Sequence, residues 1–152
     1  MMTDALLQLS TAQAVTTTAV STNNIDLSQN RDVGAGEDLY AIFTVDETAT
    51  AAGAATVELQ VITSGSADLA TPTVLGSTGP LAKTELTLGR HPIGVCINAN
   101  ALLAQPIGRR YLGVQYVVAT GPLTAGKFSA VISDTDAGKG AKSYYPSGFS
   151  VA

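Results

Sequence analysis

The sequence has few of the residues on which enzymes and metal sites depend. Its 152 residues include one histidine, one cysteine and no tryptophan. Zinc sites use several cysteine or histidine ligands. A Ser-His-Asp triad would have to use His91, although no serine stands in the G-x-S-x-G turn that holds such a nucleophile. We therefore expect neither enzymatic activity nor a metal or cofactor site.

Charged residues are also scarce, at 13% of the chain, and they carry a net charge of -4. No run of lysine or arginine could follow a phosphate backbone, so we expect no direct contact with nucleic acid. No apolar run approaches the roughly 18 residues of a membrane span, and the start of the chain lacks the basic segment of a secretion signal. These absences predict a soluble protein that is not secreted and binds no membrane.

The single cysteine, Cys96, excludes an intrachain disulfide. It lies in the apolar stretch 92–97, where the simplest expectation is a small buried side chain. A lone thiol also fits synthesis in a reducing compartment.

Short stretches of alternating apolar and polar residues recur along the chain, separated by Gly, Pro and Asn. The clearest covers residues 56–61, and residues 39–45 form another, so we expect these two strands to pair antiparallel. Residues 46–55 have no large apolar stripe and are interrupted by Gly53, which favours a long loop.

Residues 109–132 predict a β-hairpin around the turn at Gly121-Pro122. The inward face of its first strand should meet the inward face of its second strand across the turn. The residues concerned are Leu112, Val114, Tyr116 and Val118 on the first strand, and Phe128, Ala130 and Ile132 on the second.

Weaker strand patterns occur at residues 25–27, 73–75, 86–88 and 93–97, and the threonine run 16–18 favours extended backbone. Together these segments predict an all-β fold, an antiparallel β-sandwich with a jelly roll of about eight strands as the preferred topology. The expected organisation is an N-terminal arm with a first strand (1–24), the sandwich (25–136) and a C-terminal arm (137–152).

The outward face of the strand beginning at residue 111 is too apolar to be fully exposed to water. Two explanations are open: the chain covers this face itself, or a second subunit does, with Gly113 allowing close approach and Tyr111 acting as an anchor. The candidate contact residues are Tyr111, Gly113, Gln115 and Val117.

The C-terminal segment is aromatic and follows a basic, glycine-rich spacer at residues 137–142. It either packs back on its own sandwich or docks on another subunit, and we favour docking because rigid aromatic rings provide contact area at low entropic cost. The candidate contact residues here are Tyr144, Tyr145, Pro146 and Phe149.

Four segments point to a known family: DALLQLS with AQAV in residues 4–15, GEDLY with FTVD in residues 36–46, RYLGVQY at 110–116 and TAGKFSA at 124–130. In these segments the chain resembles the capsid cement, or decoration, proteins of tailed bacteriophages, of the kind described on Bordetella podophage capsids. The likeness covers most of the chain up to Asp136 and contains no catalytic signature.

The resemblance implies a jelly-roll protein on the outer capsid surface of the virion, made in the bacterial host cytoplasm. Its implied partners are the major capsid protein, whose subunits it would bridge, and further copies of itself. A homodimer is favoured by the likeness, and a homotrimer is equally a closed assembly. The alternative function is a carbohydrate-binding, lectin-like module, because jelly rolls serve as lectins and five tyrosines could stack on sugars.

Overall fold

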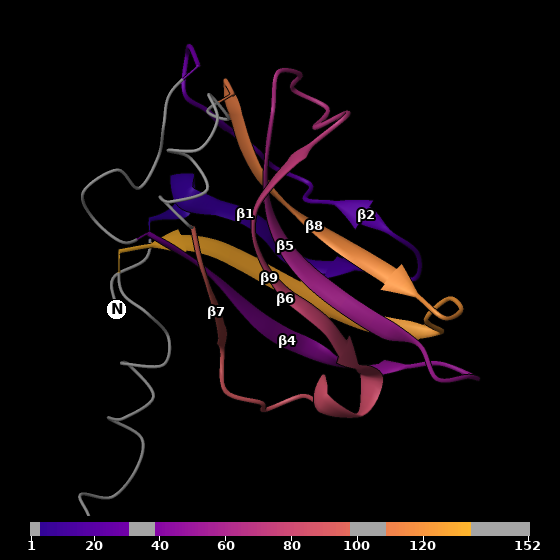
Figure 1. Ribbon diagram of the computed structural model, residues 1–152. Helices are drawn as coiled ribbons and strands as arrows, with labels where there is room; N and C mark the ends of the chain where they lie inside the picture. The colour runs from indigo at the N-terminus through magenta and orange to yellow at the C-terminus, as the bar shows by residue number, and fades with distance from the viewer. Residues whose placement is uncertain (1–3, 31–38, 98–108, 135–152) are drawn as a thin grey trace, which may run out of the picture.

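The computed structural model describes residues 4–30, 39–97 and 109–134. These residues form two antiparallel sheets that pack against each other (Figure 1). Two short 3-10 turns, η1 (Ala5–Leu7) and η2 (Lys83–Glu85), flank the strands. The strands are β1 (Gln8–Ala14), β2 (Ala19–Val20), β3 (Ile25–Asp26), β4 (Tyr40–Thr50), β5 (Thr56–Ser64), β6 (Thr73–Ala82), β7 (Ile93–Cys96), β8 (Tyr111–Ala119) and β9 (Ala125–Ser133).

The strand order confirms the predicted all-β antiparallel sandwich. One sheet has the order β1-β9-β4-β7, and the other has the order β2-β8-β5-β6, with β3 also paired to β8. The pairs are nested along the chain: β1 with β9, β2 and β3 with β8, β4 with β7, and β5 with β6. This nesting is the topology of a jelly roll, in which most consecutive strands lie in opposite sheets.

The predicted pairing of residues 39–45 with residues 56–61 is wrong. β4 pairs with β7 and β9, whereas β5 pairs with β6 and β8 in the other sheet. The long loop predicted at 46–55 is wrong for residues 46–50, because β4 continues to Thr50, whereas residues 51–55 do lie outside regular structure. Register shifts after Val45 break the alternation there, and the inward residue Ala49 is too small to produce a strong apolar signal.

The prediction of a hairpin at residues 109–132 is wrong, because the two strands do not pair with each other. The prediction of which residues face inward is correct. β8 and β9 lie in opposite sheets, so the turn between them crosses the sandwich. Thr120 and Gly121 have positive φ angles of 61° and 102° at this crossing. The two inward faces do meet, across the core rather than across a hairpin.

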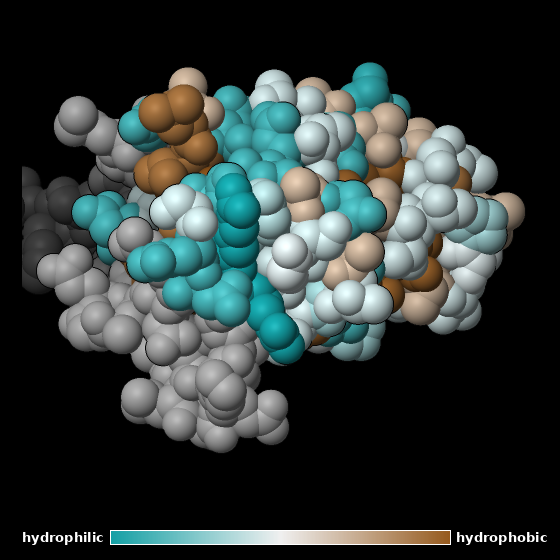
Figure 2. All heavy atoms as spheres, turned by 90° about the horizontal axis from the view of Figure 1, so that it is seen from above, coloured by the Kyte–Doolittle hydropathy of each residue, from teal (hydrophilic) through white to brown (hydrophobic). Residues whose placement is uncertain are grey.

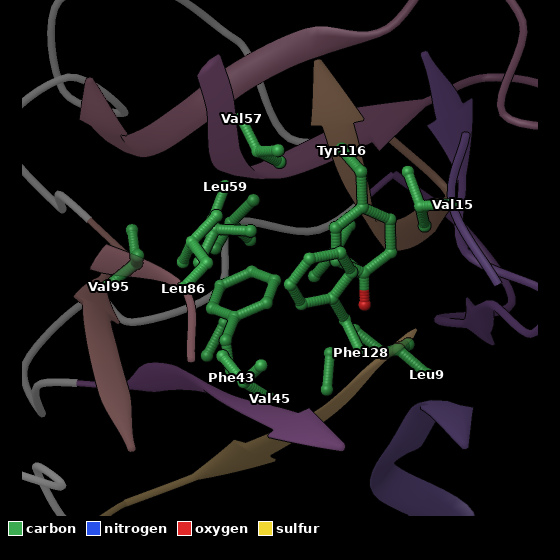
Figure 3. Close-up of a cluster of buried hydrophobic side chains, with 14 of the residues drawn as sticks. Leu9, Val15, Phe43, Val45, Val57, Leu59, Leu86, Val95, Tyr116 and Phe128 are labelled. Atoms are coloured by element: carbon green, nitrogen blue, oxygen red, sulfur yellow. The ribbon is translucent and has the colours of Figure 1, made fainter. Parts of the chain in front are cut away.

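Aromatic rings from both sheets form the centre of the core (Figure 3). Tyr116 of β8 is fully buried and stacks on Phe128 of β9, with ring centroids 5.5 Å apart, and Phe43 of β4 meets Tyr116 edge-on at 6.0 Å. Such pairs add to the stabilisation from buried area because the ring edges and faces carry opposite partial charges. The core therefore joins the sheets through these three rings, and the sequence predicted the inward position of Tyr116 and Phe128.

The region from residue 64 to residue 90 contains fewer strands than expected. Residues 73–75 belong to β6, which continues through Gly79-Pro80 to Ala82 although these residues are turn formers. Residues 86–88, predicted as a strand, lie outside regular structure after η2, with Leu86 fully buried and Leu88 65% exposed.

The N-terminal residues are part of the sandwich, which begins at Gln8 rather than at residue 25. β1 pairs with β9, β2 and β3 pair with β8, and the threonines at 16–18 form the bend between β1 and β2. The expectation of a buried Cys96 is also wrong: β7 is the last strand of its sheet, and Cys96 is exposed there. The predicted C-terminal arm lies outside the described residues.

Candidate interaction surface

The four predicted contact residues of β8 lie on its outward face, with register partners on β5. Tyr111 pairs with Ser64, Gly113 with Ile62, Gln115 with Gln60 and Val117 with Glu58. Gly113 is buried, and the other three predicted residues are half-buried.

Gly113 is covered by the chain itself. A Cβ atom at this position would lie 2.4 Å from Cδ1 of Leu69 and 3.1 Å from Oγ of Ser21. Leu69 is 2% exposed and belongs to the segment between β5 and β6, so this segment covers the outward face at Gly113. The close approach that Gly113 permits is therefore made by the chain itself at this position.

Tyr111 lies beside an ion pair that joins β3 to β8. The guanidinium of Arg110 is 5.1 Å from the centroid of the Tyr111 ring. The same guanidinium donates two hydrogen bonds to Asp26, from Nε to Oδ1 and from Nη2 to Oδ2, each 2.8 Å long. These bonds, followed by one from the Ser28 amide, lower the pKa of Asp26 to about 2.

The rest of this face, around Gln115 and Val117, is polar. Gln60 Nε2 donates a 2.9 Å hydrogen bond to Glu58 Oε1, and the Ser77 hydroxyl donates to the same oxygen. These bonds lower the pKa of Glu58, so its carboxylate stays charged at neutral pH. A partner that binds here has to satisfy a charged, hydrogen-bonded cluster next to a single valine.

The outward face of the four-stranded sheet has a hollow that sequence reasoning missed. Its volume is about 350 Å³, and its lining includes Ile42 of β4 and Val131 of β9, which lie directly opposite each other in the sheet. A second hollow of about 290 Å³, with Leu7, Leu39 and Ile132 in its lining, shares Asp4 with the first. The sequence did contain a signal for this hollow. Ile42 and Val131 occupy outward positions in their strands, and β-branched apolar residues at outward positions indicate that the surface is covered.

Contacts join the two sheets at both sides of the sandwich, where β1 meets the chain around β2 and where β6 meets β7. Between β1 and the chain leading from β2, the Asn23 amide donates to the Leu9 carbonyl at 2.9 Å, and Gln13 Nε2 donates to the Val20 carbonyl at 2.8 Å. On the opposite side, Gly76 of β6 lies so close to β7 that a Cβ atom would be 2.4 Å from the Cys96 carbonyl oxygen.

The surface seen from above Figure 1 is mostly teal and white, and brown atoms form only small separate groups (Figure 2). On this side, the described part of the molecule therefore presents no broad apolar patch to a partner.

The described residues contain no group of three or more His, Cys, Asp and Glu side chains that could hold a metal ion. His91 is exposed, ahead of β7. In the same described ranges, no helix is long and apolar enough to cross a membrane. The predicted tail contacts, Tyr144, Tyr145, Pro146 and Phe149, lie outside the described residues.

No curated protein matches the sequence. The sequence model of the Bbp16 family matches residues 9–132, a span that begins one residue inside β1 and ends one residue before the end of β9. The match thus covers nearly the whole jelly roll, and the chain belongs to the Bbp16 family.

Proposed function

We propose that this protein is a capsid cement, or decoration, protein of a tailed bacteriophage. It binds the outer surface of the shell and bridges neighbouring major capsid protein subunits. The observation that carries the proposal is the Bbp16 match over nearly the whole jelly roll, because the family name suggests a Bordetella phage protein and the chain resembles the cement proteins of such phages.

A protein of this kind stabilises a shell by mass action. A ligand that binds the assembled shell and not the separated subunits shifts the equilibrium towards the shell. A second copy or a second contact on the same molecule binds at high effective concentration, which multiplies the overall affinity. The contacts between the sheets at both sides and the paired aromatic core fit this role, since a bridging module has to transmit force without opening.

Self-association is part of the proposal, with a homodimer favoured and a homotrimer compatible with the same surfaces. Mass photometry of the purified chain measures the oligomer directly. An image reconstruction of decorated shells then shows whether the oligomer lies on local two-fold or three-fold positions.

The test of capsid binding uses expanded shells purified without this protein. The wild-type chain should co-sediment with these shells and raise the temperature or denaturant concentration at which they disassemble. His91→Ala is the matched control, because a cement protein does not use this exposed histidine in any reaction and the variant should behave like the wild type. Absence of binding, or binding without added shell stability, would contradict the proposal.

The carbohydrate-binding alternative finds no support in the described tyrosines. Tyr116 is buried in the core, Tyr111 lies beside Arg110, and Tyr40 is half-buried on β4. Sugar recognition by stacking needs an exposed aromatic face, and none of these three tyrosines is exposed. Reproducible hits on a glycan array would favour the alternative over capsid binding.

A further inference from the structure

We propose that the aromatic segment of the C-terminal tail, residues 144–149, occupies the hollow on the outward face of the four-stranded sheet and the second hollow that shares Asp4 with it, in the same molecule. This proposal is independent of capsid binding. It concerns the free protein and chooses between the two explanations that the sequence left open for the tail.

The hollows have the chemistry of a site for apolar side chains. Val131 is half-buried and lies opposite Ile42, which is already 1% exposed on the outward side of β4. Leu7 and Leu39, also half-buried, line the second hollow. The turn η1 contributes Ala5 to the first lining and Leu7 to the second, and its Leu6 is 84% exposed. An apolar occupant would remove the exposed parts of Val131, Leu7, Leu39 and Leu6 from water, which is favourable in proportion to the area covered.

The tail begins at this site. Asp134, directly after β9, lines the second hollow together with Ser133. Nine residues, 135–143, lie between Asp134 and Tyr144. An extended chain covers about 3.3 Å per residue, so this stretch reaches across both hollows with length to spare. A tether of this length holds its end at an effective concentration in the millimolar range, which favours the chain's own tail over that of a second copy.

The charges of the tail and of the hollows are complementary. Asp4 lines both hollows, Asp134 lines one of them, and Asp46 accepts a 2.6 Å hydrogen bond from Ser129, which lines the other. Among the described residues, neither hollow has a lysine or arginine in its lining. The spacer of the tail carries Lys139 and Lys142, and the segment after it carries Tyr144, Tyr145 and Phe149. A basic spacer followed by aromatic rings matches an apolar hollow with an acidic rim.

The experiment is distance-dependent cross-linking in the full chain. In a Cys96→Ser background, Tyr145→Cys is combined either with Thr44→Cys, in the lining of the first hollow, or with Val74→Cys, which is 43% exposed in the other sheet. Treatment with a short bismaleimide at low protein concentration should give at least a fivefold higher yield of internally cross-linked monomer for the Thr44 pair than for the Val74 control.

Equal yields for the two pairs would overturn the proposal, and so would cross-linked dimers as the main product of the Thr44 pair.

A second measurement, by NMR, uses no new cysteine. The methyl NMR signals of Ile42 and Val131 should shift when Tyr144, Tyr145 and Phe149 are all replaced by alanine, while those of Val57 in the core stay in place. Unchanged Ile42 and Val131 signals would likewise contradict tail docking.

Discussion

The hydroxyl of Tyr116 lies 2.6 Å from Oγ of Ser10, inside the core. Tyr116 belongs to β8 in one sheet and Ser10 to β1 in the other, so this hydrogen bond joins the two sheets near the stacked rings of Tyr116 and Phe128 (Figure 3). Both side chains are fully buried. Each hydroxyl therefore depends on the other for a partner, since a buried polar group without one destabilises the fold.

Removing either hydroxyl should destabilise the protein by about 1–3 kcal/mol, because the remaining one loses its partner in a buried place. Tyr116→Phe and Ser10→Ala should each lower the free energy of unfolding measured by urea denaturation. The double variant should cost clearly less than the sum of the two single variants, since it leaves neither group unpaired. Additive effects would show that the two hydroxyls are not coupled.

The same tyrosine should make the fold sensitive to high pH. Burial raises the pKa of Tyr116 above its usual value of 10.0, and the hydrogen bond between Tyr116 and Ser10 opposes this only in part. Because the folded pKa is raised, this contribution to stability is fully present below the unfolded pKa and is lost as pH rises beyond it. Between about pH 8 and about pH 11, the wild type should lose more unfolding free energy than Tyr116→Phe. Parallel pH profiles would contradict this assignment.

Gly113 should not tolerate a side chain while Leu69 covers it. The added methyl group of Gly113→Ala would lie 2.4 Å from Cδ1 of Leu69 and should cost on the order of 1–3 kcal/mol, and Leu69→Ala in the same chain should recover part of this loss. Gly53→Ala is the matched control: its nearest neighbour would be the Thr120 carbonyl oxygen at 4.0 Å, so the effect should stay within about 0.5 kcal/mol. A neutral Gly113→Ala would mean that Leu69 does not rest on β8.

Gly76→Ala should open the side of the sandwich where β6 meets β7. Here the obstacle is the Cys96 carbonyl oxygen, a backbone atom that cannot rotate away as the end of a leucine can. We expect a larger loss of stability than for Gly113→Ala. Compared with the wild type, the Gly76→Ala variant should lose more hydrogen-exchange protection at the amides of β7 than at those of β8. Unchanged protection in β7 would contradict the close contact.

The ion pair between Asp26 and Arg110 should be visible in an acid titration. The pKa of Asp26 is lowered from 3.8 to about 2, so its contribution to stability is present above the unfolded pKa and is lost as pH falls through about 2. In an NMR titration of the carboxyl groups, Arg110→Gln should move the Asp26 pKa back towards 3.8. An unchanged Asp26 titration in that variant would assign the shift to the Ser28 amide instead.

The alternation of side chains along single strands was predictable from the sequence, because a strand turns successive residues to opposite faces wherever it lies in the chain. Val57, Leu59 and Val61 face the core as expected, as do Tyr116 and Phe128. The same rule placed Tyr111, Gly113, Gln115 and Val117 on the outward face of β8.

The pairing of strands was decided only by the tertiary structure. Residues 39–45 and 56–61 carry the same alternation whether they pair with each other or face each other across a core, so the local pattern cannot distinguish the two. The jelly-roll topology itself requires β4 and β5, and β8 and β9, to lie in opposite sheets.

The candidate surfaces were likewise predictable from the sequence only in part. Alternation determined which residues of β8 point outward, whereas the cover over Gly113 comes from Leu69, which lies 44 positions earlier in the sequence. The hollow at Ile42 exists because η1, β4 and β9 meet there. A sequence thus determines the faces of each strand through local geometry, while the partners of those faces depend on contacts between segments far apart in the chain, which only the folded structure brings together.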